Sequence, residues 1–152
     1  MYDYFVATMT CTSCGTSSAA DSSTDMQTHL RDDARGIEIG AGFELDPTEV
    51  RDQDIRSSGY LATGRPRSDG ATRLIESWTC PVCKRENWAR ITIDGTKVAA
   101  IEGIALDRKA LEGAQFITDG CCVLAARLSG LPTHDLMTGA VDPVKVLLER
   151  LP

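Results

Sequence analysis

The chain has 152 residues, of which 42% are hydrophobic and 25% are charged, which is the size and composition of one globular domain with its own core. Its net charge of −6 argues against a general nucleic-acid-binding protein, because neutralisation of phosphate charge dominates such binding. The chain has no apolar run of 18 residues and no basic and apolar leader at its N-terminus. We therefore expect no membrane span and a cytoplasmic location.

The N-terminal part of the chain predicts short strands around a first pair of cysteines. Residues 2–9 alternate loosely and predict a strand that leads into Cys11-Thr12-Ser13-Cys14. Gly15 follows this pair, where a tight turn favours a residue that tolerates positive φ. Residues 16–25 are small and polar, which predicts an exposed loop.

The middle of the chain predicts more strands. Apolar residues alternate with other residues over 36–45, which indicates a strand with one apolar face that two interior glycines weaken. Residues 26–31 and 60–62 are short strand candidates, and the charged residues 48–56 fit either a short helix or an extended arm. Residues 64–70 have the composition of a loop.

The clearest local pattern surrounds a second pair of cysteines. Residues 72–79 predict a strand that runs into Cys80-Pro81-Val82-Cys83, and residues 88–93 predict a strand that leaves it. Asp94-Gly95 is typical of a two-residue hairpin turn, and residues 97–105 return as the partner strand.

The C-terminal part is predicted to be helical. Asp107 is expected to cap a short helix, and Asp119 a second helix that ends at Gly130. Asp142 followed by Pro143 is typical of a helix start. Apolar residues then recur at helical spacing, namely Cys121, Leu124, Ala125 and Leu128 in one helix and Val144, Leu147, Leu148 and Leu151 in the other.

The two Cys-x-x-Cys pairs predict a metal site. Each pair lets one turn present two sulfurs, so two pairs complete a tetrahedral shell with no open position, which is the arrangement of structural zinc. These pairs and the strands beside them resemble the zinc-ribbon group, whose members have unrelated activities. The resemblance implies a structural Zn²⁺ and a β platform. The expected ligands are Cys11, Cys14, Cys80 and Cys83.

The expected fold is α+β in a single domain over residues 1–152. A zinc-ribbon-like antiparallel β platform is formed by residues 1–15 and 72–105, a β-rich insertion by 16–71, and a helical tail by 106–152. Sixty-five residues separate the pairs, whereas the compact motif has about 15–20. The pairs therefore either share one ion or recruit further ligands from His29, His134, Cys121 and Cys122.

Other residue patterns give weaker signals. A redox role for the cysteine pairs is an alternative, although neither pair is followed by a good helix start. Cys121 is expected to pack as a small hydrophobe, and a reactive thiol beside Asp119 is the alternative. Trp78 and Trp88 flank the second pair and are expected to shield the metal in a small core.

The sequence points to a non-enzymatic accessory or interaction protein, because no catalytic constellation stands out and its catalytic residues are unknown. The partner is expected to be another protein or a second copy of the chain. One alternative is a small enzyme with its site in the inserted sheet, using His29 and nearby acids. Another is a weak nucleic-acid-binding module, or a small anion-binding patch, in the basic segment 56–97, with eight basic and four acidic residues.

Overall fold

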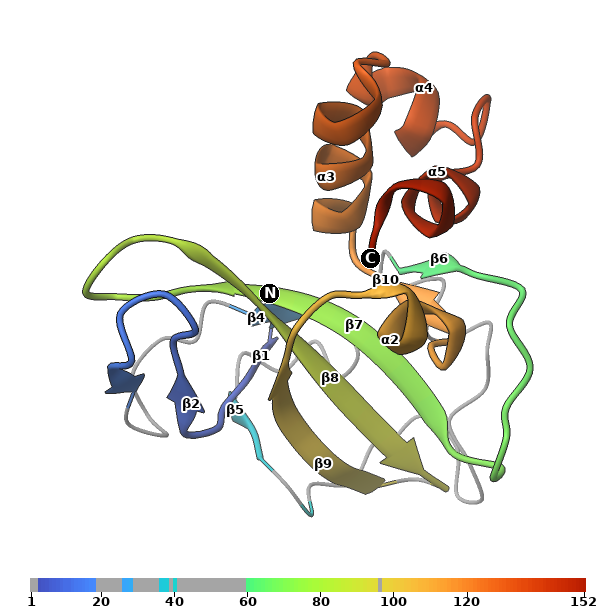
Figure 1. The fold of residues 1–152 in the computed structure, drawn as a ribbon. Coiled ribbons are helices and arrows are strands. Elements are labelled where there is room, and N and C mark those ends of the chain that lie inside the picture. Colours follow the sequence, from blue (N-terminus) through green and yellow to red (C-terminus); the bar gives the residue numbers. More distant parts are fainter. Residues whose placement is uncertain (1–2, 19–25, 29–35, 39, 41–59, 96) are drawn as a thin grey trace.

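The computed structural model describes residues 3–18, 26–28, 36–38, 40, 60–95 and 97–152. Its centre is a five-stranded sheet in the order β6, β10, β7, β8, β9 (Figure 1). Strands β7, β8 and β9 form an antiparallel meander, and β10 adds to β7 in parallel, so the platform is mixed. The five strands are β6 Leu61–Ala62, β7 Thr72–Thr79, β8 Glu86–Asp94, β9 Lys97–Ile104 and β10 Phe116–Ile117.

Shorter strands of the N-terminal half form two further sheets. β1 Asp3–Phe5 lies between antiparallel β4 Met26–Thr28 and parallel β5 Gly36–Ile37. β2 Met9–Thr10 pairs with β3 Ser17–Ser18. The strand predicted over residues 2–9 is therefore two strands in different sheets, and the loop predicted over 16–25 contains a strand at its start. Residues 41–59 lie outside the described residues, so most of the strand predicted over 36–45 and the segment 48–56 do too.

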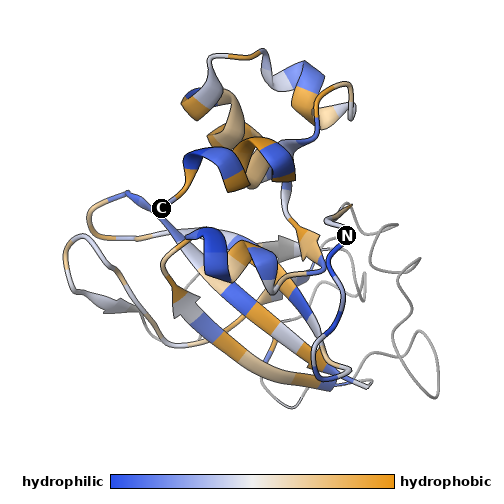
Figure 2. Cartoon of the chain, turned by 45° about the vertical axis from the view of Figure 1, so that its right-hand side comes forward, coloured by the Kyte–Doolittle hydropathy of each residue, from blue (hydrophilic) through white to orange (hydrophobic). Residues whose placement is uncertain are grey.

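The larger hydrophobic cluster lies between the five-stranded sheet and the smaller sheets. Alternate residues of β7 and β8, such as Leu74, Trp78 and Ile91, face this side, and Phe5 of β1 packs against them. Figure 2 shows this alternation of hydrophobic and hydrophilic residues along the central strands. The period-two alternation gives each sheet one apolar face, and the central sheet packs against the smaller sheets through these faces.

The helices form a second hydrophobic cluster on the opposite face. Ile75 of β7 lies at its centre, and half-buried Trp88 and Ile104 pack against it. Figure 1 shows α3, α4 and α5 grouped beyond one end of the sheet, with α2 beside β7. The helices are α2 Arg108–Glu112, α3 Asp119–Ser129, α4 Thr133–Met137 and α5 Pro143–Arg150. Helices packed beside sheets confirm the predicted α+β class.

The helix caps confirm two sequence predictions and correct a third. Asp107 accepts a hydrogen bond from the N–H of Ala110 at the start of α2, and Asp142 accepts one from Val144 at the start of α5. The cap of α3 is Thr118 instead of Asp119. The N–H of Thr118 donates to the carbonyl of Ile75 at 3.0 Å, which keeps Thr118 extended, so the helix begins at Asp119, one residue earlier than predicted.

Among the described residues, no helix is long and apolar enough to cross a membrane. This finding agrees with the absence of a long apolar run in the sequence.

Candidate metal centre

Two turns of the same geometry carry the four cysteines. In the first turn, Cys11 donates its N–H to Thr16 and accepts from Gly15, both at 3.0 Å. In the second, Cys80 donates its N–H to Arg85 and accepts from Lys84, again both at 3.0 Å. β2 leads into the first turn and β7 into the second, so two separate parts of the chain supply equivalent pairs of sulfurs.

The two turns place Gly15 and Lys84 at equivalent positions with positive φ, 75° and 62°. Lys84 is the one residue other than glycine with positive φ among the described residues. This conformation costs a non-glycine residue about 1–2 kcal/mol, and the closure of the second turn therefore holds Lys84 in a strained state.

Gly15→Ala is expected to lower the free energy of unfolding by about 1 kcal/mol. A Cβ at Gly15 would meet no atom of the described residues within 4 Å, so the expected cost comes from the backbone conformation. Lys84→Gly is the matched variant and is expected to raise the free energy of unfolding. Urea denaturation of both variants checks the pair, and the same sign for both would contradict the strain argument.

The four sulfurs converge on one point. All four lie within 4.8 Å of one another. Cys11 Sγ lies 3.5 Å from Cys83 Sγ, and Cys14 Sγ lies 3.7 Å from Cys80 Sγ. A tetrahedral ion with Zn–S distances of about 2.3 Å places its sulfurs about 3.8 Å apart. The spacing thus fits four thiolates around one metal ion. In each of the two close pairs, one sulfur comes from the first turn and the other from the second.

This convergence separates the four cysteines from three of the alternative ligands. Cys121 and Cys122 are fully buried in the helical cluster and do not join the sulfur cluster. His134 is exposed on α4, where its backbone carbonyl accepts the N–H and hydroxyl of Thr138. His29 lies outside the described residues. Within the described part of the chain, the four cysteines of the two pairs form the one group that could hold a metal ion together.

The surroundings of the cysteines do not support a thioredoxin-like redox pair. β3 follows the first turn and β8 follows the second. Such a redox site relies on a helix N-terminus to stabilise its thiolate, and neither turn leads into one. The six cysteines form no disulfide.

Asn87 links the two turns and was not foreseen from the sequence. Its side chain is 3% exposed. Oδ1 accepts from the N–H and the hydroxyl of Thr12, both at 3.0 Å, and Nδ2 donates to Cys11 Sγ at 3.4 Å. Nδ2 also donates to the carbonyl of Arg85 at 3.2 Å. One amide therefore holds a ligand sulfur and both turns in place.

Asn87→Ala is expected to weaken metal binding by about 10–100-fold, as removal of a group that orients a ligand commonly does. Competition with a chromophoric zinc chelator measures the effect. Asn87→Asp is the sharper variant, because it keeps the acceptor for Thr12 and loses the donor to Cys11. Unchanged affinity in both variants would show that Asn87 only fills space.

Hydrogen bonds around the sulfurs favour thiolates at two of the four positions. The pKa of Cys11 is lowered to about 5, first by the backbone N–H of Cys14 and then by Asn87. The pKa of Cys14 is lowered by the hydroxyl and backbone of Thr16. At Cys83, the backbone of Arg85 favours the thiolate, but burial and the neighbouring sulfurs outweigh it and raise its pKa to about 11. A bound cation would favour the thiolate at all four.

The two tryptophans do not share the role predicted for them. Trp78 is 2% exposed and lies in the same hydrophobic cluster as Cys11 and Cys80. Trp88 pairs with Ser77 across the sheet and faces the helices instead. The prediction that both shield the metal is therefore wrong for Trp88.

The other two cysteines behave as core residues. Burial raises the pKa of Cys121 well above its usual range and also raises that of Cys122. Both thiols pack in the helical cluster beside Ala125 and Leu136. The prediction that Cys121 packs as a small hydrophobe is confirmed, and the reactive thiol is not supported.

Comparison with known proteins adds no relative. The chain matches no protein family, no curated protein and no solved structure. The four converging sulfurs, which could hold a metal ion, are a feature of the chain itself.

Proposed function

We propose that the chain is a zinc-stabilised accessory protein that binds a protein partner and performs no reaction at its metal. The observation that carries this proposal is the cluster of four cysteine sulfurs within 4.8 Å of one another. Soft thiolate ligands in this geometry favour Zn²⁺. Four protein ligands fill the tetrahedral shell, so no position is left for an activated water, and the ion would act as a staple.

The position of the cluster supports a structural role. It joins the turn after β2 to the β7–β8 turn, two segments that are 66 and 72 residues apart at the closest sulfur pairs. A single ion would therefore fix the N-terminal strands against the central sheet. Reduced cysteines that hold zinc are common in the cytoplasm, and we propose that compartment for the protein.

The tip of the second turn supports a protein partner. Val82 is 62% exposed, and Lys84 and Arg85 beside it are exposed as well. An exposed aliphatic side chain with charged neighbours offers an apolar contact beside polar ones, as protein interfaces do. The complementary partner, another protein or a second copy of this chain, would offer an apolar contact bordered by carboxylates.

A nucleic-acid-binding module is the second candidate, and the same exposed pair of Lys84 and Arg85 favours it. The excess of 22 acidic over 16 basic residues opposes it. Fluorescence anisotropy with a labelled single-stranded oligonucleotide at low salt separates the candidates. Salt-sensitive binding that Lys84→Gln and Arg85→Gln abolish would favour nucleic acid, and no binding would favour a protein partner.

Metal content and Co²⁺ substitution test the structural role. The purified chain is expected to hold one zinc ion, which Cys80→Ser loses and Cys122→Ser retains. Co²⁺ in the same site is expected to give the intense visible bands of tetrahedral sulfur coordination. These bands should not change when imidazole or cyanide is added, because a closed shell has no exchangeable position. A spectral shift on addition of either ligand would reveal an open site and overturn the proposal.

A further inference from the structure

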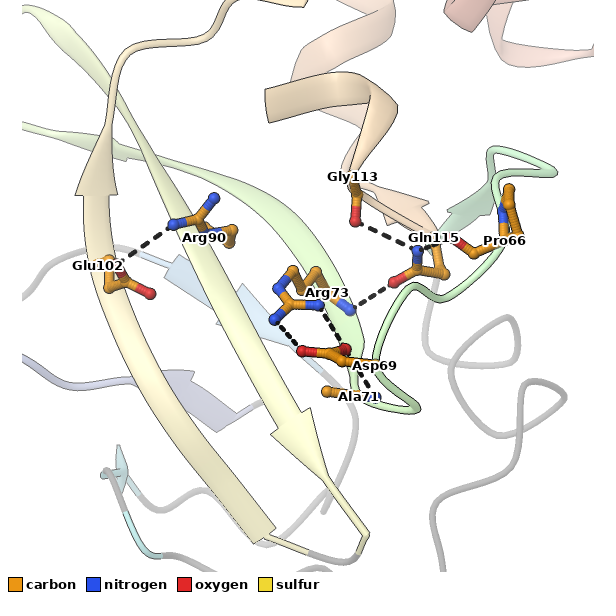
Figure 3. Close-up of polar contacts among 8 residues, drawn as sticks. All are labelled: Pro66, Asp69, Ala71, Arg73, Arg90, Glu102, Gly113 and Gln115. Carbon is orange, nitrogen blue, oxygen red and sulfur yellow. Dashed lines mark hydrogen bonds and ion pairs between the residues drawn. The ribbon is translucent and has the colours of Figure 1, made fainter. Parts of the chain in front are cut away.

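A cleft of about 560 Å³ lies on the helix-facing side of the central sheet, between the strands and α2. The cross-strand pairs Arg73–Thr92 and Arg90–Glu102 place these side chains on the same face. Figure 3 shows the guanidinium groups of Arg73 and Arg90 on this side of the sheet, near the end of α2. The volume lies in the range of about 300–1,000 Å³ that is typical of small-molecule sites.

The acidic groups around this cleft already accept hydrogen bonds. Asp69 accepts two from Arg73, at 2.9 and 2.7 Å. Glu102 accepts one from Arg90 at 3.3 Å, and Asp107 accepts the N–H of Ala110 at 2.8 Å as the cap of α2. Asp69 and Glu102 are therefore paired with arginines of the protein itself (Figure 3), and Asp107 caps α2.

The basic groups are less fully used. The guanidinium of Arg90 has five N–H donors, and one of its nitrogens makes an ion pair with Glu102. Its Nε is buried and has no hydrogen-bond partner among the residues that the structure describes. Lys109 lines the cleft from α2 and is exposed, and the hydroxyls of Ser68 and Thr92 lie in the same lining. Cations and carboxylates are balanced in number here, and each carboxylate accepts at least one hydrogen bond, whereas Arg90 has more donors than its one ion pair uses.

The remaining lining suits the organic part of a ligand. Ile104, Ala105 and Ala110 give the cleft an apolar side next to the basic groups. A ligand that carries an anionic group on a small apolar body would match both sides.

The side chain of Gln115, between α2 and β10, ties the backbone of Arg73 to its surroundings. Gln115 is 5% exposed, and its Oε1 accepts the N–H of Arg73 at 2.8 Å. Its Nε2 donates to the carbonyls of Pro66 and Gly113, at 3.1 and 3.2 Å. One amide thus joins β7, the loop that carries Asp69, and the end of α2 (Figure 3). The cleft is built on tied elements, which lowers the cost of ordering them on binding.

We propose that this cleft binds a small organic anion, whose carboxylate or phosphate group is held by Arg90 and Lys109. Arg90 would keep its contact with Glu102 and offer its remaining outward donors to the oxyanion. Arg73 would contribute positive charge while paired with Asp69. The site lies on the opposite side of the sheet from the cluster around Trp78 that contains Cys11 and Cys80, so it is independent of the metal.

Titration of the zinc-loaded protein with malonate and with inorganic phosphate tests the site by amide chemical-shift changes. At least one of the two anions is expected to give saturable shifts at β8, β9 and α2. The arm that saturates identifies carboxylate or phosphate as the bound group. Arg90→Gln is expected to weaken binding at least about tenfold, because hydrogen bonds to charged groups contribute about 1.5–3 kcal/mol. Lys109→Gln is expected to weaken it too.

Glu102→Gln and Arg85→Gln are the matched controls. Glu102→Gln removes the competing carboxylate and is expected to tighten binding, a gain that unfolding cannot imitate. Arg85→Gln removes an exposed cation outside the cleft lining and is expected to leave the affinity of the cleft for both anions unchanged. Failure of both anions to saturate at millimolar concentration would overturn the proposal. Equal weakening by Arg85→Gln, or looser binding in Glu102→Gln, would do the same. Zinc content of every variant is expected to equal that of the wild type.

Discussion

Cys80→Ser is expected to remove most of the free energy of unfolding of this protein. Cys80 is fully buried and packs in the same cluster as Trp78 and Cys11. Structural zinc contributes apparent free energies of about 10–16 kcal/mol in zinc-finger peptides, whereas a whole domain is typically stable by about 5–15 kcal/mol. Even the chain-entropy term alone, for a cross-link that closes a loop of this size, is about 4 kcal/mol.

Denaturation followed by the fluorescence of Trp78 and Trp88 measures this effect, with and without a strong chelator. The wild type is expected to lose its cooperative transition on chelation, and Cys80→Ser is expected to lack that transition in both conditions. Cys122→Ser is the control, because Cys122 is equally buried but lies in the helical cluster. A wild-type transition in Cys80→Ser would show that the sulfur cluster does not stabilise the fold.

The two hydrophobic clusters predict which parts of the chain lose stability first when the metal is removed. The cluster with Cys11, Cys80 and Trp78 contains two of the proposed metal ligands, whereas the cluster of α3, α4 and α5 contains none of them. Amide exchange after chelation is therefore expected to rise first in β2, β7 and β8. Protection of α3 and α5 is expected to fall less, because they pack in the helical cluster, which contains neither Cys11 nor Cys80.

The sequence predicts best those features that depend only on residues close together along the chain. The strand predicted over residues 72–79 has the bounds of β7, and the turn predicted at Asp94-Gly95 joins β8 to β9. A strand with one buried face requires apolar and polar residues to alternate along it. Gly95 adopts the positive φ of 62° that the turn needs. The four metal-ligand candidates were predictable for the same reason, since Cys-x-x-Cys is a local turn motif.

Features that depend on register or on distant residues were not predictable. The second cysteine turn has a length that places Thr79 opposite Glu86 and therefore Trp78 opposite Asn87. As a result, Trp78 and Trp88 lie on opposite faces of the sheet. The two-residue strand β10 exists because it pairs with β6 and β7. The role of Asn87 requires both turns to be close in space. None of these leaves a signal in the nearby sequence.

Glu76→Gln is expected to stabilise the protein at alkaline pH and to remove a pH dependence of its stability. Glu76 is 3% exposed in β7, and burial raises its pKa to about 8 from the ordinary value of 4.5. The hydroxyl of Tyr60 donates to its Oε1, and Asp119 adds a negative charge nearby. Burial also raises the pKa of Tyr60 well above its usual range, so both groups stay neutral in the fold.

The sign of the effect follows from proton binding. Between the unfolded value of 4.5 and the folded value of about 8, the folded chain holds a proton that the unfolded chain has lost. The free energy of unfolding therefore falls as pH rises through this window, by at most about 1.4 kcal/mol per pH unit and a few kcal/mol in all.

Urea denaturation across the window is expected to show this slope in the wild type and to lose it in Glu76→Gln. Tyr60→Phe is the matched variant: it removes a hydrogen bond that lowers the pKa of Glu76, so its slope should extend to higher pH. A wild-type slope that survives in Glu76→Gln would assign the dependence to another group.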